Sequence, residues 1–187
     1  MDEVQEQHER ATGDVFISEL NQKQGKQYKF YQRGNQAPDL IYRDGNSEIS
    51  LEISTCYYDS NDAKARWQIA RNRPDAPKGW ESTDGTDFEK NLIMNINTDI
   101  ENKCAKDYGQ NCFLIVYITP PIITFEDMKD LLPSIKAPSK YHFAGIYLMG
   151  HFGVTNNSLI SLAIWKLAPN SNHTLFATRP WNSHRNK

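Results

Sequence analysis

Residues 37–54 read APDLIYRDGNSEISLEIS and carry the signals of a β-hairpin. A short apolar and aromatic run, residues 40–42, precedes Asp44-Gly45, which supplies the positive-φ residues that a tight turn requires. After the turn, aliphatic residues alternate with polar ones: Ile49, Leu51 and Ile53 against Glu48, Ser50, Glu52 and Ser54. Because side chains alternate across a strand, this pattern predicts a strand with one aliphatic face in the core.

This hairpin carries two carboxylates that its two strands can bring close together. Asp39 opens the first strand after Pro38, and Glu52 lies on the polar face of the second. Adjacent carboxylates repel each other unless a cation lies between them, and a divalent metal with oxygen ligands suits that place. The alternative is that Pro38-Asp39 only starts a turn and that Glu52 is solvated.

Length and composition favour one soluble domain, residues 1–187, with 11% aromatic residues and a net charge of −2. This balance neither requires nor excludes nucleic acid as a partner. The three cysteines lack the spacing of a zinc site and, being odd in number, argue against a disulfide framework. Without a signal-like N-terminus or a long apolar run, we expect a cytoplasmic protein.

Helical periodicity over residues 3–20 places Glu9 in the same sector as Phe16 and Leu20. A carboxylate in an apolar stripe is costly unless it is paired or binds a metal, although Glu9 could also reach water at the helix end.

The other predicted elements complete a mixed α/β pattern. Strands are expected at 28–32, 112–119, 143–149 and 159–167, and helices at 62–71, 88–106 and 125–132. The continuous apolar run at 112–119 indicates a strand buried on both faces, in the centre of the sheet. Residues 72–88 are expected to form a long mobile loop, and residues 178–187 a loose basic tail.

Polar and aromatic residues after the hairpin are candidates for contact with a ligand. Lys64, Gln68 and Arg71 form one stripe of the predicted helix, beside Trp67. Trp80 in the loop could stack on a base or fasten the loop to the body. A solvated helix face is the alternative for the stripe.

The order helix, three strands, helix, strand (αβββαβ) resembles the core of the PD-(D/E)XK nucleases, the restriction-endonuclease-like fold, over about residues 3–150. Pro38-Asp39 resembles the PD motif, and Glu52-Ile53-Ser54 resembles (D/E)-x-K. Glu9 corresponds to the acidic residue that the first helix often contributes. The resemblance implies an α/β (α+β) fold in which a mixed central sheet is flanked by helices.

The resemblance also implies a metal site and a reaction. Asp39, Glu52 and the Ile53 backbone carbonyl would bind Mg²⁺ or Mn²⁺, with Glu9 as an extra ligand. Ser54 stands where the family has lysine. Since some relatives carry this lysine on a neighbouring element, Lys64 is the expected substitute. Residues expected to contact substrate are Ser54, Trp67, Gln68, Arg71 and Trp80.

Three functions remain open at this stage. The first is a metal-dependent nuclease acting on DNA or RNA, for which the resemblance also allows a homodimer. The second is a non-catalytic nucleic-acid-binding or assembly module that kept the fold and lost the lysine. The third, a histidine metallo-hydrolase, fits poorly because His142 and His151 flank a predicted strand and would lie at opposite ends of it.

Overall fold

The computed structural model of the chain describes residues 3–57, 60–77, 88–118, 123–153, 160–169 and 173–180. The elements are α1 (Glu3–Gln24), β1 (Lys29–Arg33), β2 (Leu40–Asp44), β3 (Ser47–Cys56), α2 (Ser60–Ala70), α3 (Phe88–Cys104), β4 (Cys112–Ile118), α4 (Phe125–Leu131), the 3₁₀ turn η1 (Leu132–Ser134), β5 (Gly145–Gly153), β6 (Ile160–Ala168) and β7 (Thr174–Pro180).

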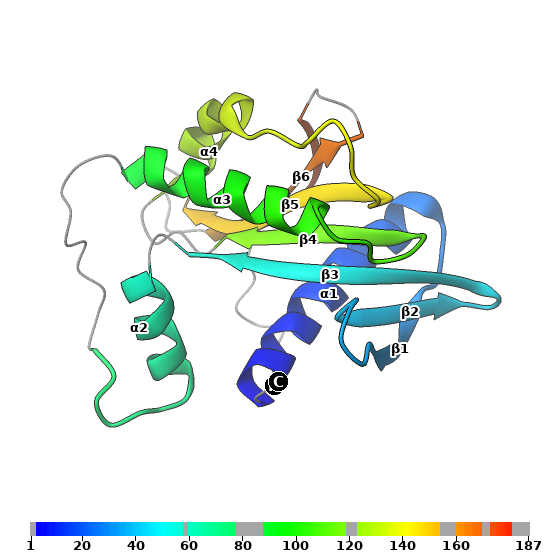
Figure 1. Cartoon of the computed structure of the whole chain (residues 1–187), viewed down its shortest axis with the longest axis horizontal. Coiled ribbons are helices and arrows are strands. Elements are labelled where there is room, and N and C mark those ends of the chain that lie inside the picture. Colours follow the sequence, from blue (N-terminus) through cyan, green and yellow to red (C-terminus); the bar gives the residue numbers. More distant parts are fainter. Residues whose placement is uncertain are drawn as a thin grey trace.

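The strands form one sheet in the order of the sequence, from β1 to β7 (Figure 1). β1, β2 and β3 are antiparallel, β3, β4 and β5 are parallel, and β5, β6 and β7 are antiparallel. The predicted mixed α/β class is confirmed, and β4 lies at the centre of the sheet, as its apolar sequence predicts.

α1 covers one face of the sheet, below it in Figure 1. Its buried side chains Phe16, Ile17 and Leu20 pack on the sheet. The sheet residues of this core include aliphatic side chains of β2, β3 and β4 and an aromatic one of β5: Leu40, Leu51, Ile53, Ile115 and Tyr147. Gly13 permits this close packing, since a Cβ there would lie 2.5 Å from Leu40 Cδ1 and 2.7 Å from the Tyr42 hydroxyl. The glycine that weakens the helix by propensity is therefore required by packing.

α3 and α4 cover the opposite face of the sheet (Figure 1). Their core includes Leu92, Ile96, Ile100, Leu114, Val116, Met128 and Phe152. The stripe at spacings of three and four along α3 is buried as predicted. Ile53 belongs to the α1 side, so Glu52 and Ser54, its neighbours along β3, face α3.

Several sequence expectations need correction or fall outside the described residues. α1 continues to Gln24, four residues beyond the expected end of the helix at residue 20. The start of the expected loose tail belongs to β7, a strand that the sequence did not predict. The expected mobile loop is described only as far as residue 77, and Trp80 lies outside the described residues.

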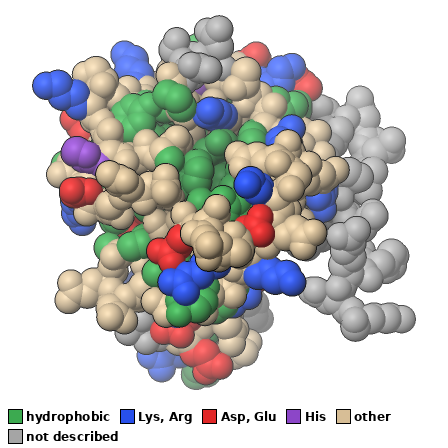
Figure 2. All heavy atoms as spheres, turned by 90° about the vertical axis from the view of Figure 1, so that its right-hand side faces the viewer, with side chains coloured by type: hydrophobic (Ala, Val, Ile, Leu, Met, Phe, Trp, Pro, Cys, Tyr) green, Lys and Arg blue, Asp and Glu red, His purple; other side chains and the backbone are tan. Residues whose placement is uncertain are grey.

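Figure 2 shows the side of the molecule at the β2–β3 turn, where basic and acidic side chains are interspersed around apolar groups. Mixed charge of this kind gives no strong single-sign field on that side. Within the described ranges, none of the helices combines the length and apolar character needed to cross a membrane.

Candidate metal-binding carboxylate site

Asp39 lies beside β3 because of the register of the hairpin. Leu40 pairs with Leu51, so the next step along the two chains brings Asp39 opposite Glu52. Asp39 Oδ2 accepts a hydrogen bond of 2.8 Å from the Ile53 amide. Since the N–H and C=O of one strand residue point to the same side, the Ile53 carbonyl also faces the space beyond the start of β2.

The loop before β2 holds the backbone of Asp39, in addition to the hydrogen bond that its side chain accepts from β3. The Gly34 amide donates to the Asp39 carbonyl over 3.1 Å. A Cβ at Gly34 would lie 1.8 Å from the Pro38 carbonyl oxygen, so no other residue fits there without moving the loop. The backbone on both sides of the Asp39 side chain is therefore held in place.

The Asp39 carboxyl has a raised pKa of about 6. Burial is the largest cause, and the neighbouring charge of Glu52 is the second, with a smaller contribution from Glu9. The hydrogen bond from Ile53 and the charge of Lys103 act in the opposite direction. The site thus gathers more negative charge than its cations neutralise, which is the condition that a divalent ion relieves.

Glu52 is buried and meets a lysine that the sequence interpretation did not select. Lys103 Nζ, from the last turn of α3, lies 2.5 Å from Glu52 Oε1. The other oxygen, Oε2, is buried and has no hydrogen bond of ordinary geometry among the described residues, although the Tyr108 hydroxyl lies within bonding reach of Glu52. Burial raises the pKa of Tyr108, and the charge of Glu52 and a hydrogen bond with its carboxylate raise it further, so this phenol stays protonated beside the carboxylate.

Ser54, at the position of the motif lysine, donates from Oγ to Asp99 Oδ2 over 3.2 Å. Asp99 is four residues before Lys103 on α3, so both side chains lie on the same face of the helix. Both polar side chains that follow Ser50 on this face of β3, Glu52 and Ser54, are therefore matched by polar side chains of α3.

Glu9 is buried on α1, as predicted, and both of its oxygens are occupied. Oε1 accepts from Gln5 over 2.9 Å, and Oε2 forms an ion pair of 2.6 Å with Arg33. Its charge still contributes to the raised pKa of Asp39. Glu9 would join a metal only by exchanging one of these partners.

The donor set fits a hard divalent cation. Asp39 and Glu52 supply two carboxylates, the second of them buried, and the Ile53 carbonyl supplies a third ligand group. No group of three or more His, Cys, Asp or Glu side chains is placed to hold a metal ion in the described part of the chain. Mg²⁺ does not require such a group, because it keeps several waters and is commonly held by one or two carboxylates.

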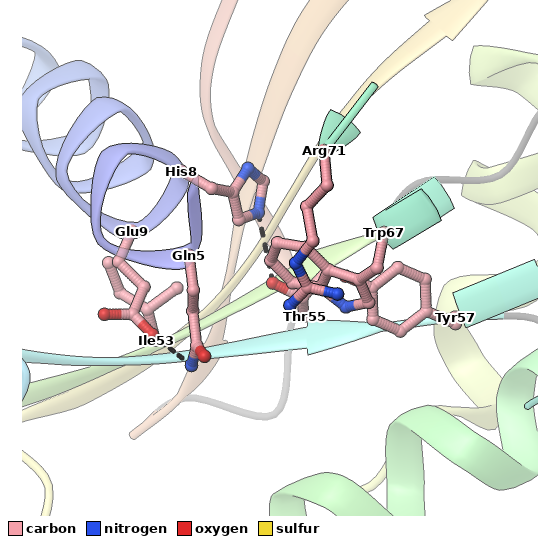
Figure 3. Close-up of a pocket in the computed structure, with 8 residues that line it drawn as sticks. All are labelled: Gln5, His8, Glu9, Ile53, Thr55, Tyr57, Trp67 and Arg71. Carbon is pink, nitrogen blue, oxygen red and sulfur yellow. Dashed lines mark hydrogen bonds between the residues drawn. The ribbon is translucent and has the colours of Figure 1, made fainter. Parts of the chain in front are cut away.

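A pocket of about 260 Å³ lies on the α1 side of the sheet (Figure 3), on the face of β3 opposite to Glu52, and shares Ile53 and Glu9 with the surroundings of Asp39. It is lined by Gln5, His8, Glu9, Ile53, Thr55, Tyr57, Trp67 and Arg71. Trp67 and Arg71, both expected to contact substrate, lie here together, with the Arg71 guanidinium carbon 5.2 Å from the centre of the Trp67 ring.

The remaining predicted residues lie apart from this group. Lys64 is exposed on α2, and the lysine that meets Glu52 is Lys103. Gln68 Nε2 contacts Asp75 at 3.4 Å and does not line the pocket. His142 is exposed, whereas His151 Nδ1 lies 2.9 Å from the Tyr117 hydroxyl.

Lys103 could have been found from the sequence by the reasoning that selected Glu9. Ile96, Asp99 and Lys103 follow each other at spacings of three and four, so the two charged residues lie on the sheet-facing side of α3. Charged residues beside a buried stripe need partners, and Glu52 and Ser54 were the polar residues facing that helix.

The sequence matches no known protein-family model, and no curated protein shows a significant match to it. The candidate site therefore stands on its own geometry.

Proposed function

We propose that the protein is a metal-dependent nuclease that hydrolyses phosphodiester bonds in DNA or RNA. The observation that carries this proposal is the pair of carboxylates on neighbouring strands, Asp39 and Glu52, next to a lysine and a backbone carbonyl. In this pair the Glu52 carboxylate is buried and the Asp39 carboxyl has a pKa raised to about 6, partly by the charge of Glu52. A structural ion pair alone gives no reason for a second buried carboxylate at the same place.

The proposed ligands are Asp39, Glu52 and the Ile53 carbonyl, with Glu9 available for a second ion if it exchanges Arg33. A bound Mg²⁺ or Mn²⁺ would supply Lewis acidity toward the phosphate and a water of lowered pKa as nucleophile. Protons compete with the metal for the Asp39 carboxylate, so the affinity for metal should fall as the pH drops through about 6.

We assign the role of the motif lysine to Lys103. Its ammonium lies beside Glu52, at the end of α3, and its stem is long enough to turn toward a phosphate oxygen. A positioned cation of this kind stabilises the charge that develops on the phosphate in the transition state. Ser54, bound to Asp99, then has a structural role in joining β3 to α3.

The arrangement of the elements supports the same proposal. α1, the β1–β2–β3 meander, a helical crossover and the parallel strand β4 agree with the αβββαβ order of the restriction-endonuclease-like core, except that the crossover contains two helices, α2 and α3. The carboxylates occur at the start of β2 and within β3, as the PD and (D/E)-x-K motifs would have them.

The test is cleavage of end-labelled DNA and RNA, single- and double-stranded, with Mg²⁺, Mn²⁺ or EDTA. We expect products only with metal, and their loss in Glu52→Gln. Glu48→Gln is the matched control, since Glu48 lies on the same strand but is exposed and paired with Arg43. Cleavage by Glu52→Gln at the rate of Glu48→Gln would refute the proposed site.

A second candidate function is a nucleic-acid-binding module without catalysis. The ion pair between Lys103 and Glu52 favours it, because this pair neutralises one carboxylate without any metal. Binding of the same oligonucleotides without cleavage, under all metal conditions, would support this candidate over the nuclease.

A further inference from the structure

The pocket beside the carboxylates differs in chemistry between its two ends. Glu9 and Ile53 line one end, and each also belongs to the carboxylate site: Ile53 through the bond to Asp39, Glu9 through its charge. The other end is formed by Tyr57, Trp67 and Arg71 (Figure 3). The pocket therefore has residues that neighbour Asp39 at one end and aromatic and cationic side chains at the other.

The aromatic end is held in position by ring contacts. Trp67 lies 6.5 Å from Tyr57 between ring centres and 6.3 Å from His8, which meets it edge-on. His8 Nε2 in turn lies 3.1 Å from the Thr55 hydroxyl on β3. Burial lowers the pKa of His8, so the ring is neutral at neutral pH and the positive charge at this end comes from Arg71.

This combination of groups suits a nucleobase with its phosphate. An aromatic ring offers a stacking surface for any base, a guanidinium attracts a phosphate, and amide and hydroxyl groups (Gln5, Thr55) can bond a base edge. The volume of about 260 Å³ is just below that of most small-molecule sites, roughly 300–1,000 Å³, so one ring system fits better than a base pair.

We infer that this pocket receives one unpaired base of the substrate strand, stacked on Trp67, beside the edge of β3 at which Asp39 binds the Ile53 amide. The inference rests on the proposed nuclease function and specifies its substrate. A base within a duplex would have to leave its stack to enter, which costs a few kcal/mol, whereas an unpaired base pays little. The preferred substrate is thus a strand that is unpaired at the cleavage site.

The test measures oligonucleotide binding in EDTA by fluorescence anisotropy, so it does not depend on cleavage. The probes are a labelled single strand, the blunt duplex of the same sequence, and a set of single strands with one abasic nucleotide at successive positions. We expect the single strand to bind at least about tenfold more tightly than the duplex, and one abasic position to weaken binding by a similar factor.

Trp67→Ala should weaken single-strand binding at least about tenfold and remove the effect of the abasic position, while Trp67→Phe retains most of the affinity. Ile69→Ala is the matched control, because Ile69 is a large exposed side chain on the same helix and does not line the pocket. Thermal unfolding of each variant identifies any that is misfolded, and Trp67→Phe then carries the comparison with the control.

Equal binding of single strand and duplex, or no effect of Trp67→Ala, would overturn the inference while leaving the nuclease proposal intact. An abasic strand that binds as tightly as the intact strand at every position, with loss only in Arg71→Ala, would show that the pocket takes a phosphate alone. This also overturns the inference. Absence of both binding and cleavage for every oligonucleotide would overturn the function itself.

Discussion

Replacing Asp39 with asparagine should stabilise the metal-free protein at neutral pH and destroy its response to metal. Asparagine has the same shape and keeps an oxygen that can accept from the Ile53 amide, but it carries no charge. The folded protein holds the Asp39 carboxyl at a pKa of about 6, against 3.8 for the ordinary group. The charged form is therefore disfavoured by folding.

Proton linkage gives the sign and the size of the effect of Asp39→Asn on the free energy of unfolding. Between pH 3.8 and about 6 the folded state binds more protons at Asp39 than the unfolded state, so its contribution to stability falls as pH rises. The raised pKa of Asp39 lowers the free energy of unfolding by about 3 kcal/mol near pH 8 and by about 1 kcal/mol near pH 4.5. The advantage of Asp39→Asn over wild type should grow by about 2 kcal/mol between these pH values, or roughly 4–8 °C in the unfolding midpoint.

The assay is unfolding followed by circular dichroism in EDTA at both pH values, then at the higher pH with saturating Mg²⁺. Wild type should gain stability from Mg²⁺ by mass action, and Asp39→Asn should not. Asp130→Asn, an exposed change on α4, is the control and should behave as wild type. An Asp39→Asn advantage that stays constant or shrinks with rising pH would refute the reasoning about this carboxyl.

Two further predictions follow from the packing around the site. Lys103→Met should lower the cleavage rate by about 100-fold or more, because Glu52 loses its cation and the phosphate loses a positioned charge. Lys64→Met should cleave like wild type. The reverse pattern would show that Lys64 is the lysine that stabilises the phosphate charge. Gly13→Ala should destabilise the protein by about 1–3 kcal/mol in urea, since the new methyl group meets Leu40, and an unchanged midpoint would show that α1 can move away.

The sequence predicted the elements with strong periodicity. The alternation at 47–54 correctly separated Ile53 from Glu52, because a strand buried on one face cannot shift by one residue without exposing its core side chains. The apolar run of β4 likewise identified the centre of the sheet. Glu9 was found because a charge in a buried stripe needs a partner, and Arg33 supplies one.

What the sequence did not predict depends on contacts between distant segments. Lys103 reaches Glu52 across a sequence separation of 51 residues, and only the crossover from β3 to β4 brings α3 over that strand. β7 was missed because TLFATRP ends in Arg-Pro and has little alternation, and it is formed by pairing with β6. Such pairing is decided by tertiary context more than by local propensity.

The central claim, that Asp39 and Glu52 hold a divalent cation, is tested most directly by titrating Mn²⁺ into the protein and measuring the free ion by electron paramagnetic resonance. Wild type and Glu48→Gln should bind Mn²⁺ saturably, with the same affinity, and Mg²⁺ should compete. Glu52→Gln should lose this binding. Equal binding by Glu52→Gln and wild type, or no saturable binding by wild type, would contradict the claim.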